Sequence, residues 1–214
     1  LNDGFACRGS TKVGMVIASH VIFGAYGFWL PNDPRGSWST FVGAWELYRN
    51  GGNATKVSTR GSLAGEAHDV MRRLAAKEER KYPTVRFDER QRHAVGEGFG
   101  GFAKRNGLRI LACAVLAEHV HLVIARHHYK AEQAVLLLKG AASRELEERK
   151  LHPMAQFPRK KGRLVSCWSR GEWKVFLSDA TDVERAIAYV DENPVKEGLP
   201  AQTWDFVRPW APEV

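Results

Sequence analysis

Two apolar runs that almost touch in the sequence constrain this fold more than any other feature. The first covers residues 108–117 and is LRILACAVLA, and the second covers residues 119–126 and is HVHLVIAR. Each run has the length of a strand, and the second follows the first almost at once. Two such runs are expected to pair as an antiparallel β-hairpin.

The remaining elements follow from residue preference and periodicity. Residues 15–24 and 173–177 are rich in β-branched and aromatic side chains and are expected to form strands. Apolar spacing or capping residues predict helices over residues 63–81, 89–105, 130–149 and 179–193. Four glycines weaken the second of these helices, and Pro194 with Gly198 is expected to end the last. The mixture predicts an α+β fold with an antiparallel sheet.

Length and charge restrict the class of protein. The chain has 214 residues with 32 Lys+Arg and 24 Asp+Glu, a net charge of +8. This length fits one domain, and the excess positive charge favours an anionic partner, of which nucleic acid is the commonest. No run reaches the roughly 18 apolar residues of a membrane span. No GxGxxG follows a predicted strand and no GxxxxGK(S/T) occurs, so a dinucleotide-binding site and a P-loop both lack support.

Three cysteines, Cys7, Cys113 and Cys167, stand far apart and form no CxxC pair. This spacing speaks against a zinc ribbon and against a disulfide framework. It favours a reducing, cytoplasmic setting.

The shortest pattern with chemical content is His119-Val120-His121. In a strand, residues i and i+2 point to one face, so the two imidazoles lie side by side while Val120 points into the core. Such a pair suits two ligands of one divalent metal ion. Two exposed histidines on a sheet face are the plainer interpretation.

A second pattern lies in the last predicted helix. Tyr189 and Asn193 are four residues apart and therefore share a helical face. An amide oxygen can bind a hard metal ion, and a phenol can act as a nucleophile. The alternative is that Tyr189 packs in the core while Asn193 ends the helix. Combined with the histidines, the pattern predicts a metal that polarises a phosphodiester and a tyrosine that attacks it.

These residues resemble a known family. His119-Val120-His121 after LRILACAVLAE resembles the HUH motif of the single-tyrosine HUH transposases. The stretch AIAYVDENPVKEGLP (186–200) resembles their tyrosine helix, and its N-P-V form is similar to the REP-associated tyrosine transposases. The opening SHVIFGAYGFWLPNDPRGSW and the tail TWDFV (203–207) also resemble transposase-like segments.

The resemblance implies a ferredoxin-like HUH endonuclease fold, with one domain over residues 1–214 and an insertion or long loop around residues 32–86. It implies that His119, His121 and Asn193 bind Mg²⁺ or Mn²⁺ and that Tyr189 is the nucleophile. The implied substrate is single-stranded DNA with a hairpin, either REP-like or at an element end, cleaved through a 5′-phosphotyrosine. The implied protein is a cytoplasmic, nucleoid-associated prokaryotic enzyme without membrane contact, either a monomer or a homodimer. Glu118 and Glu192 have no assigned counterpart.

DNA binding requires stacking platforms and cations. The first loop interleaves Trp29 and Trp38 with Arg35, although both tryptophans could instead close the core. The other candidates are basic residues, namely Lys104, Arg105, Lys139, Arg159, Lys160, Lys161 and Arg163.

Two other functions compete with a transposase. One is a catalytically silent or domesticated module that binds DNA or RNA. The other is a replication initiator or relaxase of the wider HUH class. The complete set of His119, His121, Tyr189 and Asn193 speaks against the first, and the tyrosine-helix motif speaks against the second.

Overall fold

The computed structural model of the chain describes residues 15–28, 48–49 and 69–211. The strands of this part form one sheet and are β1 (Ala18–Gly24), β2 (Ile110–Val115), β3 (His119–Ala125) and β4 (Trp173–Leu177). The helices longer than one turn are α2 (Val70–Glu78), α3 (Glu89–Asn106), α4 (Ala131–Glu148) and α5 (Ala180–Lys196). The predicted α+β class is confirmed.

The strand order across the sheet is β2-β3-β1-β4, and all neighbours are antiparallel. The β2–β3 pair is the predicted hairpin, with Val115 opposite Val120. Helix α3 connects β1 to β2, and α4 connects β3 to β4. This order with these two connections is ferredoxin-like, which confirms the expected topology.

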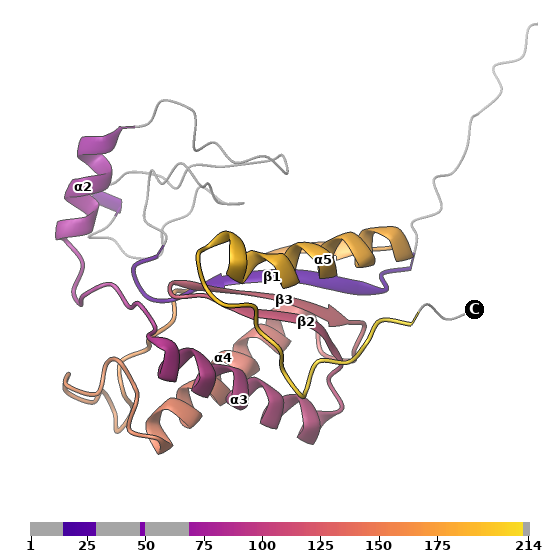
Figure 1. The fold of residues 1–214 in the computed structure, drawn as a ribbon. Coiled ribbons are helices and arrows are strands. Elements are labelled where there is room, and N and C mark those ends of the chain that lie inside the picture. Colours follow the sequence, from indigo (N-terminus) through magenta and orange to yellow (C-terminus); the bar gives the residue numbers. More distant parts are fainter. Residues whose placement is uncertain (1–14, 29–47, 50–68, 212–214) are drawn as a thin grey trace, which may run out of the picture.

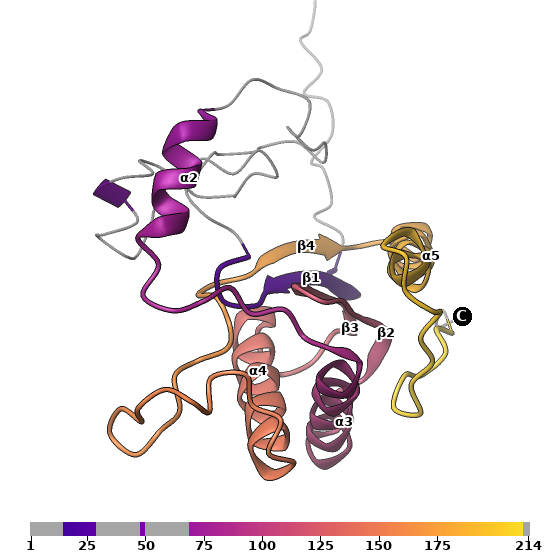
Figure 2. The same cartoon turned by 60° about the vertical axis from the view of Figure 1, so that its left-hand side comes forward.

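The sheet is covered on both faces (Figures 1 and 2). Helices α3 and α4 lie side by side on one face, over a core that includes Phe23, Phe99 and Leu138. Among the described helices only α5 lies on the other face, against small side chains such as Ala112 and Ala114. Since alanine projects little from a sheet, α5 can approach the strands closely, and this brings its side chains to the level of β3.

Helix α3 is stabilised at its start and tightly packed along its length. Asp88 and Gln91 form a capping box, in which each side chain accepts a hydrogen bond from the other residue's backbone N–H. The glycines inside the helix are needed for close approach. A Cβ on Gly98 would lie 2.7 Å from Cα of Ala142 in α4, and one on Gly96 would meet the ring of Trp204.

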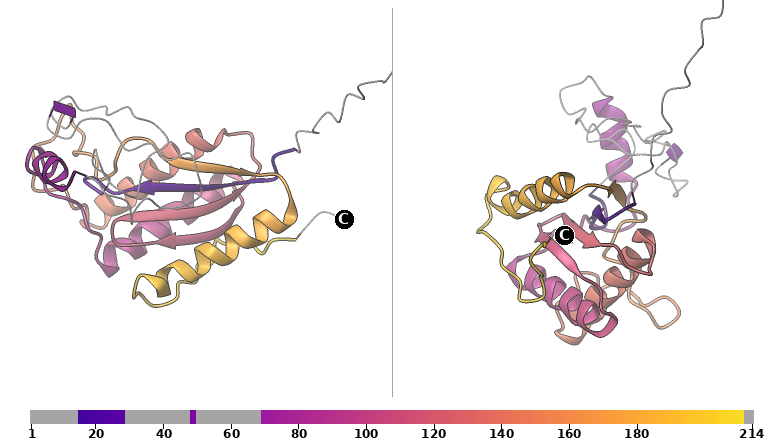
Figure 3. Two further views of the ribbon diagram at one scale, coloured as in Figure 1. Left: turned by 90° about the horizontal axis from the view of Figure 1, so that it is seen from above. Right: turned by 90° about the vertical axis from the view of Figure 1, so that its right-hand side faces the viewer.

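The C-terminal tail covers the outer edge of β2. The side-chain amide of Gln202 accepts a hydrogen bond from the N–H of Val115 and donates one to its C=O, both at 2.8 Å. Trp204 Nε1 donates to the carbonyl of Cys113. The tail thereby occupies polar groups that would otherwise form an open sheet edge. Its path beside β2 and below α5 is visible in Figure 3.

Two sequence predictions need correction, and a third remains a prediction. Helix α5 does not end at Pro194 but continues to Lys196, and Pro194 is buried inside it. A proline removes one helical hydrogen bond, and burial of its ring offsets part of that cost. Helix α2 is shorter than residues 63–81, since it begins after the N-cap Asp69. Most of the expected insertion at 32–86 lies outside the described residues.

Two further findings concern cysteines and membranes. Cys113 and Cys167 are buried free thiols, and burial raises the pKa of Cys167 to about 12. In the described ranges no helix combines the length and the apolarity that a membrane crossing requires.

Candidate active site

The histidine pair lies at the start of β3, on the sheet face that α5 covers. The ring centroids of His119 and His121 are 4.9 Å apart. Val120 points to the opposite face, where it is fully buried in the core under α3 and α4. The predicted alternation is therefore confirmed, and His121 is only 3% exposed, which excludes a fully solvated pair.

A third histidine, which the sequence interpretation did not select, joins this pair. His20 lies in β1, which pairs antiparallel with β3. Its Nε2 lies 3.3 Å from Nδ1 of His121, and its ring is 7% exposed. No local motif could have indicated His20, because its place beside His121 depends on the register between two strands far apart in sequence.

Helix α5 supplies the other two side chains. Its buried stripe consists of Val183, Ala186, Val190 and Asn193, at the three- and four-residue spacing of a helical face. Asn193 thus continues an apolar stripe, which explains why an amide side chain is only 6% exposed. Asp179 caps the helix by accepting the N–H of Asp182, and this fixes where the stripe begins.

Tyr189 lies at the margin of this stripe, over the histidines. Its ring centroid is 5.7 Å from that of His121 and 5.8 Å from that of His20. The side chain is 46% exposed, so a solvent-borne substrate can reach it. The ammonium of Lys196 lies 5.6 Å from the centre of the Tyr189 ring. The phenol therefore stands between solvent, two imidazoles and a positive charge.

Burial determines the charge state of the imidazoles. It lowers the pKa of His20 to about 4. The pKa of His121 is lowered well below the usual value by burial and by the neighbouring His119 and His20. Both rings are neutral at pH 7, which is the form that offers a lone pair to a metal ion.

The donor set suits a divalent cation. The described residues contain no group of three or more His, Cys, Asp or Glu arranged around a metal position, and the further donor that the sequence predicts is the amide of Asn193. That amide is buried, and its Nδ2 has no hydrogen-bond partner among the described residues. Because the O and N of an amide are assigned by their partners, a flipped Asn193 would present its oxygen instead. Two imidazoles and an amide oxygen fit Mg²⁺ or Mn²⁺ chemically.

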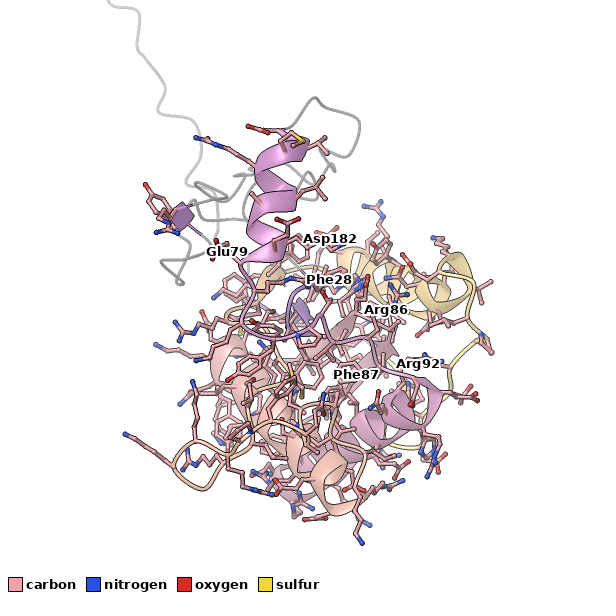
Figure 4. All side chains as sticks on the ribbon, turned by 90° about the vertical axis from the view of Figure 1, so that its left-hand side faces the viewer. Phe28, Glu79, Arg86, Phe87, Arg92 and Asp182 are labelled. Carbon is pink, nitrogen blue, oxygen red and sulfur yellow. The ribbon has the colours of Figure 1, made fainter. Side chains whose placement is uncertain are left out.

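The two unassigned glutamates each form an ion pair. Glu118 accepts a hydrogen bond at 2.7 Å from Arg86, and Glu192 pairs at 2.7 Å with Lys196. The ring of Phe28 stacks on His119, with centroids 4.5 Å apart and planes 15° from parallel. Figure 4 looks onto this end of the sheet, where Phe28 and Arg86 are labelled.

Lys139, which the sequence analysis proposed as a DNA contact, is buried in the structure. Its side chain is 8% exposed, and Nζ donates to the carbonyls of Ser169 and Gly171. Burial lowers its pKa to about 8, partly offset by Glu172. Lys139 therefore ties α4 to the segment before β4, and no DNA contact is assigned to it.

The basic loop forms a tight two-residue turn. Lys160 and Arg163 exchange backbone hydrogen bonds, and Lys161 and Gly162 between them both have positive φ. Arg159 pairs at 2.6 Å with Glu147 of α4. Lys160, Lys161 and Arg163 are exposed, so these three remain predicted phosphate contacts.

Of the other predicted DNA contacts, Lys104 and Arg105 lie away from the histidines. Lys104 and Arg105 end α3 beside the start of β2. The carbonyl oxygen of their neighbour Asn106 lies 3.2 Å from Nε2 of His127. This is the end of the sheet opposite to His119. Trp29, Arg35 and Trp38 lie outside the described residues.

Comparison with known proteins gives the family. The model of the family described as "Transposase IS200 like" matches residues 74–193, which is more than half of the chain. No curated protein matches the chain.

Two solved structures are similar at low identity. One is a REP-associated tyrosine transposase bound to a REP hairpin, with 11% identity, a TM-score of 0.45, and coverage of 91% of this chain and 76% of that one. The other is a putative transposase from Deinococcus radiodurans R1, with 16% identity, a TM-score of 0.39, and coverage of 92% and 100%. The family assignment rests on the match over residues 74–193. The chain belongs to the IS200-like transposase family.

Proposed function

We propose that this transposase is a metal-dependent single-strand DNA endonuclease and strand transferase that cleaves beside a hairpin. The observation that carries the proposal is that the half-exposed ring of Tyr189 lies over the buried His121, with ring centroids 5.7 Å apart. A tyrosine that served only packing would not need a half-exposed ring over neutral imidazoles. The net charge of +8 favours the anionic substrate.

The residues have distinct roles in the proposed reaction. His119, His121 and Asn193 would hold a Mg²⁺ or Mn²⁺ ion, which when bound withdraws charge from the scissile phosphate. The Tyr189 oxygen attacks phosphorus, and the bond from phosphorus to the 3′ oxygen breaks. The phenolic proton passes through solvent to that leaving oxygen, which becomes a 3′-hydroxyl. The ammonium of Lys196, which pairs with Glu192, lies 5.6 Å from the centre of the Tyr189 ring and can steer the DNA backbone toward it.

This chemistry conserves the ester bond. The downstream strand stays attached to Tyr189 through its 5′ phosphate, and a 3′-hydroxyl of another strand can attack that linkage in the reverse sense. Strand transfer therefore needs no further energy source. The hairpin preference rests on the likeness of the tyrosine helix to the REP-associated branch, given above.

The experiment uses a pool of single strands with a hairpin and randomised flanks, incubated with the full chain and Mn²⁺. A 3′ label is expected to migrate with the protein in a denaturing gel, and a 5′ label is expected to be released. Tyr189→Phe should lower cleavage at least about a thousandfold and leave binding of the pool nearly unchanged. The matched control is Tyr129→Phe, a tyrosine at the opposite end of β3, which should cleave normally. Cleavage by Tyr189→Phe would refute the assignment of the nucleophile.

A further inference from the structure

His20 is the one member of the histidine cluster to which the proposed function gives no task. It lies in the middle of β1, opposite Val123 in the register of the sheet, and so diagonal to His121 on the same face. An imidazole in a strand interior costs free energy when buried unless its polar atoms are paired. Its position therefore calls for a physical reason.

The pairing is specific for one atom of His121. Nε2 of His20 lies 3.3 Å from Nδ1 of His121, while the ring centroids are 5.6 Å apart and the planes 29° from parallel. The rings thus meet edge to edge rather than face to face. Trp173 packs edge-on against His20 at 5.5 Å, and Tyr189 does so at 5.8 Å, which holds the His20 ring in place.

Two nitrogens in hydrogen-bond contact share one proton, and its location fixes the free nitrogen of each ring. If Nδ1 of His121 carries the proton, its Nε2 keeps a lone pair for a cation. If the shared proton stays on His20, Nε2 of His121 carries the proton of that ring and cannot bind a cation. The hydrogen bond made by one ring nitrogen of a histidine therefore determines whether the other nitrogen can bind a metal ion.

We propose that His20 is a positioning residue that accepts the Nδ1–H of His121 and thereby presents Nε2 of His121 to a divalent cation. The inference rests on the proposed function for the identity of the cation. The His20–His121 hydrogen bond itself is a feature of the metal-free chain. His20 touches neither the cation nor the substrate in this assignment.

The competing role for His20 is plain packing between Trp173 and Tyr189. Glutamine and leucine separate the two roles. His20→Gln keeps an amide that can accept the Nδ1–H of His121, whereas His20→Leu fills space without an acceptor. A packing role predicts that leucine, as the apolar residue, serves at least as well as glutamine.

The first measurement is the imidazole ¹⁵N–¹H correlation spectrum of the full metal-free chain. His121 is expected to be in the Nδ1–H form in the wild type and in His20→Gln, and to shift toward Nε2–H in His20→Leu. An Nε2–H form of His121 in the wild type overturns the inference, whatever the chain does with metal.

The second measurement is Mn²⁺ affinity, followed by the electron paramagnetic resonance of free Mn²⁺. His20→Leu should bind about 10- to 100-fold more weakly than the wild type, the usual effect of removing a partner of a metal ligand, and His20→Gln should recover most of that loss. His93→Gln, at an exposed histidine of α3, is the control and should bind normally.

The outcomes distinguish the two proposals. Wild-type binding of Mn²⁺ together with equal binding by His20→Leu overturns the positioning role and leaves the proposed function intact. A wild type that binds no Mn²⁺ overturns the metal-dependent function and, with it, the role of Nε2 as a ligand. A folded His20→Leu that has lost both the tautomer and the affinity, with rescue by His20→Gln, supports the inference.

Discussion

The ring of Tyr189 in α5 lies 5.7 Å from the ring of His121 in β3, across the interface between the last helix and the sheet. Two segments from different parts of the chain meet at this point because α5 packs on a face of small residues. The distance between the rings therefore depends on the packing of the whole helix. It also depends on the capping of α5 at Asp179 and on the burial of Pro194.

Replacement of Asn193 by leucine should raise stability while it weakens metal binding. The Asn193 amide is buried with an unpartnered nitrogen, which costs about 1–3 kcal/mol. Leucine of similar volume removes that cost, so the free energy of unfolding in urea should rise by about 1 kcal/mol. Mn²⁺ affinity should fall at least about tenfold.

Asn193→Asp is the matched comparison for that variant. It keeps an oxygen donor and should retain Mn²⁺ binding, but it buries a charge in the metal-free chain and should be less stable than the wild type. A leucine variant that is less stable than the wild type and binds Mn²⁺ normally would contradict the ligand assignment.

Two glycine substitutions with opposite expected signs test the contact between α3 and α4. A Cβ on Gly98 would lie 2.7 Å from Cα of Ala142, whereas one on Gly140 meets only the end of Arg144 at 3.7 Å. Gly98→Ala should therefore lower the free energy of unfolding by about 1–3 kcal/mol despite its better helix propensity. Gly140→Ala should raise it by about 0.5–1 kcal/mol. Equal effects of the two variants in urea titrations would show that the helices do not pack this closely.

Loss of the Gln202 side chain should destabilise the edge of the sheet. Its amide makes two hydrogen bonds of 2.8 Å with the backbone of Val115. Gln202→Ala should cost about 1–3 kcal/mol of unfolding free energy, since two backbone groups lose their partner. Amide hydrogen exchange at Val115 should become faster, and the free energy of opening derived from it should fall by a similar amount. Gln156→Ala, at an exposed loop position, should change neither quantity.

Lys139 should give the chain a specific dependence of stability on pH. Burial lowers its pKa in the folded chain from the ordinary 10.5 to about 8. Between these values the unfolded chain binds more protons than the folded one, so stability due to this group rises as pH increases from 8 to 10.5 and is flat below 8. Unfolding in urea at pH 7.5, 9 and 10.5 measures the effect.

The comparison for this effect is Lys139→Met, which has no titrating group at the position. The unfolding free energy of the wild type minus that of the variant should increase with pH over that range. Other lysines and tyrosines contribute equally to both proteins and cancel in this difference. A constant difference across the three pH values would show that the ammonium is not disfavoured by its site.

Much of the fold was open to prediction because it depends on local pattern. The hairpin of β2 and β3, the strand β4 over residues 173–177 and the start of α3 after Asp88 all follow from residue preference and capping. The alternation of His119, Val120 and His121 follows from the two-residue period of a strand. The family match over residues 74–193 bears out the resemblance that these motifs carry.

The errors at Lys139, at Pro194 and at the glycines of α3 share one physical origin, which is burial by partners distant in sequence. Lys139 reads as a surface residue by type, yet it lies beneath the carbonyls of Ser169 and Gly171. Pro194 reads as a helix end by its missing N–H, yet packing carries α5 past it to Lys196. The glycines of α3 read as helix breakers, yet they make room for α4 and the tail.

The sequence by itself determined which chemical groups are present and which of them share a face, because strand and helix periods are local. It therefore specified the histidine pair on one strand and the tyrosine and asparagine on one helix. Only the tertiary structure decided that Tyr189 of this helix meets His121, and that His20 lies beside Nδ1 of His121. Strand register and helix docking are set by the whole core, whose packing free energy is spread over many side chains and is not encoded at any single position.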